Sequence, residues 1–281
     1  MKIITDPAKM RKFIANEKAR GRKIGFVPTM GYLHKGHLAL IRRAKRENGI
    51  VVMSVFVNPA QFGPGEDYTK YPRDFKKDAR MAKKEGVNAI FYPAVKSMYL
   101  PGHSTYINVE KLSGHLCGRR RSGHFRGVAT IVAKLFNIIS ADNAYFGQKD
   151  AQQAVIIKKM AEDLNIPVEI KTIPTVREKD GLAMSSRNAY LNKKERYEAT
   201  ALFKSLSLAK KMIKQGERGS RKIIKTIKDF ISKNSSARID YVSVADLGSL
   251  KEIKALKGQV LIAIAAYFGK TRLIDNVILE V

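Results

Sequence analysis

The chain has 281 residues, of which 53 are Lys or Arg and 25 are Asp or Glu, so its formal net charge is +28. Apolar residues make up 44% of the chain, which is enough for a buried core and argues against intrinsic disorder, and a single cysteine excludes an intrachain disulfide. The longest apolar stretches, such as residues 260–268, fall far short of a membrane-spanning helix, and the N-terminal residues lack the pattern of a signal peptide, so we expect a cytoplasmic protein.

The first part of the chain predicts strands that alternate with helices. Residues 23–28 form a short apolar run, residues 35–47 an amphipathic helix and residues 50–57 a strand that is apolar on both faces. Three further helix-to-strand pairs follow: 74–84 with 89–92, 128–139 with 144–147, and 151–164 with 168–173. This alternation predicts an α/β fold with a Rossmann-like, doubly wound parallel sheet.

The pattern changes after Pro174. A polar loop covers residues 177–188 and precedes two lysine-rich helices and three strands. The helices are expected at 193–215 and 221–233, and the strands at 239–245, 259–267 and 272–279. We therefore expect two domains, 1–176 and a smaller α+β domain at 177–281.

The positive charge has two interpretations. It can mark a surface that binds nucleic acid, or it can come from solvated helix faces. Lysines recur at helical spacing without the interleaved aromatic residues of single-strand binders, at positions Lys204, Lys210, Lys211, Lys214, Lys222, Lys225 and Lys228. We therefore favour solvated helices and expect no nucleic-acid partner.

Residues 28–37 contain two histidines three positions apart, where the first predicted strand gives way to a helix. Free backbone N–H groups and the positive end of the helix dipole favour an anion here, and Gly31 and Gly36 permit a close approach by phosphate. The same dipole is expected to keep His34 and His37 neutral, as donors to phosphoryl oxygens.

Two other roles are open for this pair. One histidine can simply cap the helix, or the pair can bind a metal ion. A metal ion needs further ligands, and neither an HExxH pattern nor a nearby carboxylate supplies them. We expect no metal site made by the protein alone.

The four residues His34-Lys35-Gly36-His37 resemble the HxGH signature shared by class I aminoacyl-tRNA synthetases and small nucleotidyltransferases, which act on the α-phosphate of a nucleotide. Further blocks narrow the resemblance. They are Pro28-Thr29-Met30-Gly31, Phe56-Val57-Asn58-Pro59 with Gln61-Phe62, Gly147-Gln148-Lys149-Asp150 with Gln152-Gln153, residues 180–188, residues 123–127 and residues 272–276. In order and spacing they are similar to the pantothenate synthetase family over essentially the whole chain.

The resemblance implies an AMP-forming ligase of the coenzyme A pathway. In this family the pantoate carboxylate attacks the α-phosphorus of ATP, and β-alanine then displaces AMP from the pantoyl adenylate. The resemblance also implies magnesium carried with ATP and, by analogy, a homodimer.

Three stretches are implied to bind ATP. They comprise Met30, Gly31, Tyr32, Leu33, His34, Lys35, Gly36 and His37; Gly147, Gln148, Lys149 and Asp150; and Val176 with Met184, Ser185, Ser186 and Arg187. Among these, His34, His37 and Lys149 are the implied catalytic residues, and the proton-donor role falls to His37. Asp150 would bind ribose or help to hold magnesium, unless it is only a helix cap.

The last of these stretches corresponds to a mobile loop that closes on the triphosphate in related enzymes, with Val176 lining the adenine pocket through its backbone. Gln61 and Gln153 are implied to contact pantoate, and Asn58 to support Gln61. Gln61 would also touch β-alanine. Residues 62–68 are a candidate lid that keeps water from the acyl phosphate.

Two rival functions use part of the same pattern. A nucleotidyltransferase that transfers CMP or AMP would share the histidine pair but would give no reason for the Gln61 and Gln153 blocks. A nucleic-acid binding protein would explain only the charge.

Overall fold

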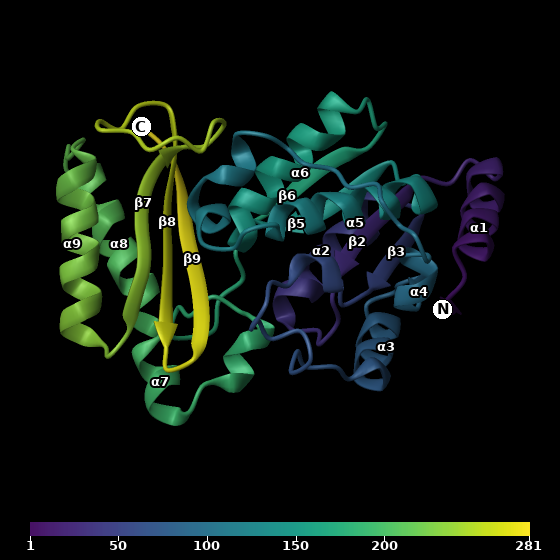
Figure 1. Ribbon diagram of the computed structural model, residues 1–281, viewed down its shortest axis with the longest axis horizontal. Helices are drawn as coiled ribbons and strands as arrows, with labels where there is room; N and C mark the ends of the chain where they lie inside the picture. The colour runs from purple at the N-terminus through teal and green to yellow at the C-terminus, as the bar shows by residue number, and fades with distance from the viewer.

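A six-stranded parallel sheet organises the larger part of the molecule. In the computed structural model, which describes residues 1–281, the strands lie in the order β1-β4-β3-β2-β5-β6 (Figure 1). They are β1 (Lys2–Ile4), β2 (Ile24–Thr29), β3 (Ile50–Val55), β4 (Ala89–Phe91), β5 (Asn143–Gly147) and β6 (Glu169–Ile173). Every residue of β3 is buried, as expected for a strand covered on both faces.

Helices cover both faces of this sheet. They are α1 (Pro7–Ala19), α2 (Lys35–Glu47), α3 (Phe75–Lys84), the single turn α4 (Val95–Met98), α5 (His124–Ile139) and α6 (Ala151–Asp163). Apolar residues of α1, α5 and α6 pack with one face of the sheet, and those of α2 and α3 pack with the other. The predicted doubly wound α/β architecture is confirmed.

The strand order contains a switch point between β2 and β5. The chain proceeds from β2 to β3 and β4 on one side of β2, whereas β5 and β6 lie on the other side. Loops that follow two such neighbouring strands diverge and leave a crevice at the carboxyl edge, where ligands of α/β proteins bind. The two histidines follow β2 at the start of α2, and Lys149 lies in the turn after β5.

Two differences from the predicted elements have physical causes. The sequence analysis predicted nothing before residue 23, where β1 and α1 lie. Helix α5 begins at His124, four residues before the predicted start, because glycines at 123 and 127 weaken the helical pattern. Gly127 is nevertheless required inside α5, since a Cβ there would lie 2.1 Å from the carbonyl oxygen of Ala60.

The C-terminal part forms a smaller antiparallel sheet in the order β7-β8-β9. Its elements are α7 (Lys193–Glu198), α8 (Thr200–Lys214), α9 (Ser220–Asn234), β7 (Arg238–Asp246), β8 (Gln259–Phe268) and β9 (Thr271–Glu280). Residues 193–215 contain two helices instead of the one predicted helix. A capping box of Asn192 and Glu195 begins α7, and Ala199 separates α7 from α8.

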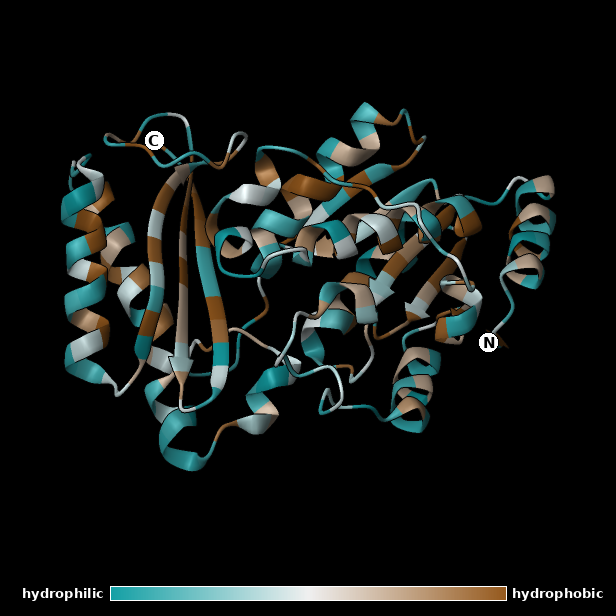
Figure 2. Ribbon diagram, viewed as in Figure 1, coloured by the Kyte–Doolittle hydropathy of each residue, from teal (hydrophilic) through white to brown (hydrophobic).

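The small sheet is covered on both faces. One face packs against α8 and α9 in a separate apolar core, whereas Leu250, Leu261 and Ala263 belong to the main core of the larger unit. Figure 2 shows the brown, apolar side of α9 turned toward the strands and its teal side turned outward. All seven lysines that the sequence placed on helix faces lie on α8 and α9 and are exposed.

None of the helices combines the length and the apolar character needed to cross a membrane.

Candidate active site

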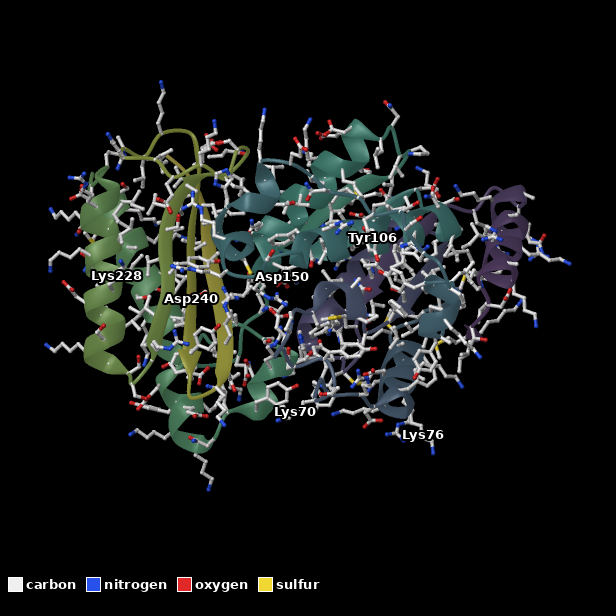
Figure 3. All side chains as sticks on the ribbon, viewed as in Figure 1. Lys70, Lys76, Tyr106, Asp150, Lys228 and Asp240 are labelled. Carbon is white, nitrogen blue, oxygen red and sulfur yellow. The ribbon has the colours of Figure 1, made fainter.

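A cavity of about 230 Å³ opens at the carboxyl ends of β2 and β5, beside the C-terminal unit. Fifteen of the predicted site residues line it: Met30, His34, Gly36, His37, Asn58, Gln61, Gly147, Lys149, Asp150, Gln153, Val176, Met184, Ser185, Ser186 and Arg187. Figure 3 shows Asp150 where the two units meet. Segments more than 100 residues apart in sequence therefore converge on one space.

Five predicted ATP-binding residues do not line this cavity. They are Gly31, Tyr32, Leu33, Lys35 and Gln148. Leu33 is buried in the core beneath α2, whereas Lys35 is exposed. Tyr71, Arg121 and His124 line the cavity although the sequence analysis assigned them no ligand. Arg121 and His124 belong to or adjoin segments that it quoted, but nothing in the sequence marked Tyr71.

His34 and His37 cap the helix and also line the cavity. The Nδ1 atom of His34 accepts the backbone N–H of Gly36 at 3.1 Å, and Nδ1 of His37 accepts that of His34 at 3.3 Å. An Nδ1 atom that accepts carries no proton, so each neutral ring keeps its proton on Nε2. The capping role and the ligand role, which the sequence left as alternatives, are therefore compatible.

Burial keeps both imidazoles neutral. It lowers the pKa of His34 to about 4, with the positive charge of Lys149 as the second cause. Burial also lowers the pKa of His37 well below its usual value, followed by repulsion from His34 and Lys149. The prediction of neutral rings is confirmed, but desolvation, not the helix dipole, is the largest cause of the lowered pKa values.

The backbone around these histidines is less free than predicted. The sequence suggested open N–H groups for a phosphate, but five already donate to protein atoms, those of Gly31, Tyr32, Leu33, His34 and Gly36. Gly36 serves a different purpose, because a Cβ there would lie 2.8 Å from Cε1 of the His34 ring. Because Gly36 has no side chain, the imidazole of His34 fits beside it.

Lys149 lies in the turn η4 (Gln148–Asp150), which the C-terminal unit holds in place. The Nδ2 atom of Asn276 on β9 donates to the carbonyl oxygens of Gln148 and Lys149, both at 2.9 Å. The Lys149 ammonium lies 3.6 Å from Oδ1 of Asp150. Asp150 stands at the start of α6 but makes no capping hydrogen bond with its side chain, so its carboxylate is available to the cavity.

Asn58 and Gln61 lie side by side in the cavity wall and are held by hydrogen bonds. Asn58 is buried, accepts the hydroxyl of Tyr99 at 2.7 Å, and donates to Oε1 of Gln61 at 3.2 Å. The turn η1 (Pro59–Gln61) packs directly on α5 at Gly127. Asn58 therefore fixes Gln61 and leaves the Gln61 amide nitrogen near Met30, at 3.0 Å from its sulfur.

A third fixed histidine, His124, supports the backbone of Gln61. One Nη of Arg121 lies 3.0 Å from Nε2 of His124, and Nδ1 of His124 lies 2.8 Å from the Gln61 carbonyl oxygen. Arginine can only donate, so His124 is protonated on Nδ1 and donates to Gln61. Burial, together with Arg121, lowers the pKa of His124 to about 4.

The segment after Val176 closes one wall of the cavity. The turn η5 (Ser186–Tyr190) is capped by Ser185, whose Oγ accepts the N–H of Arg187. The Arg187 guanidinium donates to both carboxylate oxygens of Asp67, at 2.7 and 2.9 Å. Arg121 makes a similar double contact with Glu66, at 2.5 and 2.7 Å. Two adjacent acidic residues of the expected lid thus bind two arginines of the cavity wall.

The cavity is suited to anions. Its charged side chains are Lys149, Arg121 and Arg187 against the carboxylate of Asp150, and each arginine also pairs with an acidic side chain that does not line the cavity. No group of three or more His, Cys, Asp and Glu side chains lies close enough to hold a metal ion. The histidine pair is a poor ligand set in any case, because both Nδ1 atoms are occupied by backbone donors and both Nε2 atoms carry protons.

Comparisons with known proteins agree on one family. The sequence profile described as Pantoate-beta-alanine ligase matches residues 2–278. The pantothenate synthetase of Acetivibrio thermocellus is 54% identical over 281 residues, which cover 100% of both chains.

Two solved structures have the same fold. The pantothenate synthetase of Thermus thermophilus superposes with a TM-score of 0.94 at 42% identity and covers 99% of both chains. The pantoate-beta-alanine ligase of Francisella tularensis, complexed with beta-gamma ATP and beta-alanine, has a TM-score of 0.80 at 32% identity, over 99% of this chain and 97% of that one. With a profile match and relatives that span the whole sequence, the chain belongs to the pantoate-beta-alanine ligase family.

Proposed function

We propose that the cavity joins pantoate to β-alanine in two steps. The pantoate carboxylate attacks the α-phosphorus of ATP and pyrophosphate leaves; the β-alanine amine then attacks the acyl carbon and AMP leaves. The observation that carries this proposal is the convergence of His34, His37, Lys149 and Ser185 on one cavity, from three segments far apart in sequence.

The negative charge of the triphosphate is matched by neutral and cationic donors. The Nε2–H groups of His34 and His37 and the ammonium of Lys149 would donate to the α-phosphate oxygens, whose charge grows in the transition state. His37 would supply the hydrogen bond at the departing oxygen as a neutral donor. Ser185, Ser186 and the Arg187 guanidinium would bind the β- and γ-phosphates.

The remaining ATP contacts are proposed on the same basis. Val176 lies on the cavity wall, where its backbone would meet adenine, and Met30, Gly36, Gly147 and Met184 would line the nucleotide. Backbone and side chains of Gly31, Tyr32, Leu33, Lys35 and Gln148 would shape the site from behind it.

Magnesium would arrive with ATP. The ion commonly uses one or two carboxylates, waters and phosphate oxygens. Asp150 fits this pattern because its carboxylate makes no capping hydrogen bond and lies beside Lys149 on the cavity wall. Bound there, magnesium would neutralise part of the triphosphate charge.

Pantoate and β-alanine would meet beside the amide side chains of the cavity wall. Gln61 and Gln153 would bind the pantoate carboxylate and hydroxyls, and Asn58 would hold Gln61 in place. Because the amine must reach the activated carboxyl, Gln61 would also lie beside β-alanine.

Three broader expectations belong to the same proposal. Residues 1–176 would form the catalytic domain and 177–281 the domain that carries the closing segment; the apolar core around α8 and α9 draws only on residues after 181. By family analogy we propose a homodimer in the cytoplasm.

Exchange of labelled pyrophosphate into ATP tests the function. We expect exchange only when pantoate is present, because the adenylate must form before pyrophosphate can return. Exchange without pantoate would contradict the proposal and favour transfer of a nucleotide to a different acceptor.

One variant tests the central residue. We expect His37→Ala to slow pantoyl adenylate formation by about 100-fold or more in a single turnover, the scale of a lost donor at a growing charge. His115→Ala is the matched control, because His115 lines neither this cavity nor the smaller one beside it, whose lining includes Cys117 and Arg272. Equal rates in the two variants would remove His37 from the mechanism.

A further inference from the structure

A buried carboxylate lies behind the histidine pair, on a helix that supplies nothing to the cavity. Asp78 belongs to α3 and is 1% exposed. Its Oδ2 accepts the backbone N–H of Tyr32 at 2.8 Å, and its Oδ1 accepts that of Leu33 at 2.7 Å. One side chain therefore binds two consecutive residues of the loop between β2 and α2.

That loop has an unusual backbone. Gly31 has φ +84° and Tyr32 has φ +51°, so two successive residues are left-handed. A non-glycine residue such as Tyr32 is rarely stable in this region without support from its surroundings. A Cβ at Gly31 would lie 2.9 Å from Oδ2 of Asp78, which shows that the carboxylate occupies the space beside the turn.

The loop sets the direction of both imidazoles. Leu33 is followed directly by His34, which begins the helix as its cap. The N–H of His34 donates to Nδ1 of His37, and the N–H of Gly36 donates to Nδ1 of His34. A change in the path of residues 31–33 would therefore move the backbone N–H of His34, which orients the His37 ring.

From this arrangement we propose that Asp78 is a positioning residue for adenylate formation. By holding the N–H groups of Tyr32 and Leu33, it fixes the start of α2, so that His34 and His37 both direct Nε2–H into the cavity. It acts through the histidines and does not touch the substrates. The inference rests on the proposed function.

The sharpest variant is Asp78→Asn. It keeps the shape of the side chain but replaces one accepting oxygen with an NH₂ group, which then faces a backbone N–H. We expect the rate of pantoyl adenylate formation to fall about 100-fold, the scale of a small misplacement of catalytic groups, while the KM for pantoate changes little.

The control comes from the same helix. Asp74 caps α3 by accepting the N–H of Lys77 at 3.0 Å and makes no contact with the loop. Asp74→Ala should lower the melting temperature and leave adenylate formation near the wild-type rate. If Asp74→Ala slowed the reaction as much as Asp78→Asn at an equal loss of stability, Asp78 would be merely structural.

The ¹⁵N spectra of the imidazoles test the role of Asp78 without depending on the reaction. In the wild type, ¹⁵N spectra of the imidazoles should show the Nε2–H form for both His34 and His37, and in Asp78→Asn a mixture of forms. Unchanged spectra and rate would overturn the inference. Absence of adenylate formation in the wild type would instead refute the proposed function, and the spectra would still report on Asp78.

The wild-type protein provides a test that needs no variant. The amides of Tyr32 and Leu33 should exchange with deuterium much more slowly than other loop amides, because a buried carboxylate accepts both. Exchange at the rate of open loop amides would also overturn the inference.

Discussion

His34 and His37 show how a helix cap can also prepare a chemical group. Two backbone N–H groups select the tautomer by donating to Nδ1, and burial beside Lys149 disfavours the charged form. Each ring is therefore held as a fixed neutral donor. In the proposed mechanism no proton has to be gained or lost at these rings before ATP binds.

The lowered histidine pKa values predict how stability depends on pH. The folded protein holds His34 and His124 with pKa values of about 4, whereas in the unfolded chain they return to about 6.5. Between these values the unfolded state binds more protons, so stability falls as the pH drops from 6.5 toward 4. Urea unfolding at a series of pH values measures this slope.

A matched variant shows how much of this pH dependence of the free energy of unfolding comes from His124. His124→Gln cannot be protonated, so its free energy of unfolding should fall less steeply over the same pH range than that of the wild type. A wild-type free energy that stays constant from pH 7 to pH 5 would contradict the prediction.

Gly36 provides a second prediction at this scale. In Gly36→Ala the added methyl group would lie 2.8 Å from the His34 ring, so the imidazole must move. We expect adenylate formation to fall about 100-fold, because the donor leaves its position. Gly49→Ala is the control, since its methyl group would meet Arg22 at an ordinary 3.6 Å. A Gly36→Ala enzyme as fast as the control would contradict this account.

At the scale of elements, periodicity predicted most of the strands and helices but could not predict their exceptions. Helix α5 was placed four residues late because Gly127 weakens its pattern, and Gly127 is needed because η1 approaches α5 from more than 60 residues away in sequence. The division between α7 and α8 falls at Ala199, where no side chain caps α8, so nothing in the continuous lysine-rich pattern marks it. Local signals predict the type of an element, whereas long-range contacts decide its ends.

The contact between β9 and η4 predicts an effect across the two units. Asn276→Ala removes the donor that binds the carbonyl oxygens of Gln148 and Lys149. Losing two hydrogen bonds to these half-buried acceptors should cost about 1 kcal/mol, and the released turn should raise the KM for ATP several-fold. Chemical unfolding and steady-state kinetics measure the two effects.

Asn234→Ala is the control for Asn276, because Asn234 also donates to a carbonyl oxygen, that of Phe230, but at the exposed end of α9. It should leave the KM for ATP unchanged. If both variants had the same KM for ATP, the hydrogen bonds of Asn276 to Gln148 and Lys149 would have no part in binding ATP.

For the whole molecule, the motifs in the sequence predicted which segments meet, and the cavity contains fifteen of the twenty predicted residues. Their partners could not be predicted. Asp67, Glu66, Asp78 and Asn276 each bind a site residue or its loop from 45 or more positions away in sequence. Only the folded chain brings such pairs together, because a single aspartate or asparagine carries no sign of its distant partner.

The ion pair between Asp67 and Arg187 joins residues 62–68, the expected lid, to the segment after Val176, which is proposed to close on ATP. Its side chains are only 24% and 28% exposed, and both oxygens of Asp67 are used. Asp67→Asn should loosen this closure and let water reach the acyl phosphate. We expect the variant to release more AMP than pantothenate, whereas the wild type should release equal amounts.

The control for this variant is a surface ion pair of the same type. Asp163→Asn removes the partner of Lys159 on α6, where both side chains are about half exposed, and should keep the one-to-one ratio. Parallel assays of AMP and pantothenate decide the matter. A one-to-one ratio in Asp67→Asn would mean that the lid excludes water without this ion pair. Closure would then have to depend on other contacts of the lid, namely the ion pair of Glu66 with Arg121 or the packing of Phe62 against Tyr68 and Tyr71.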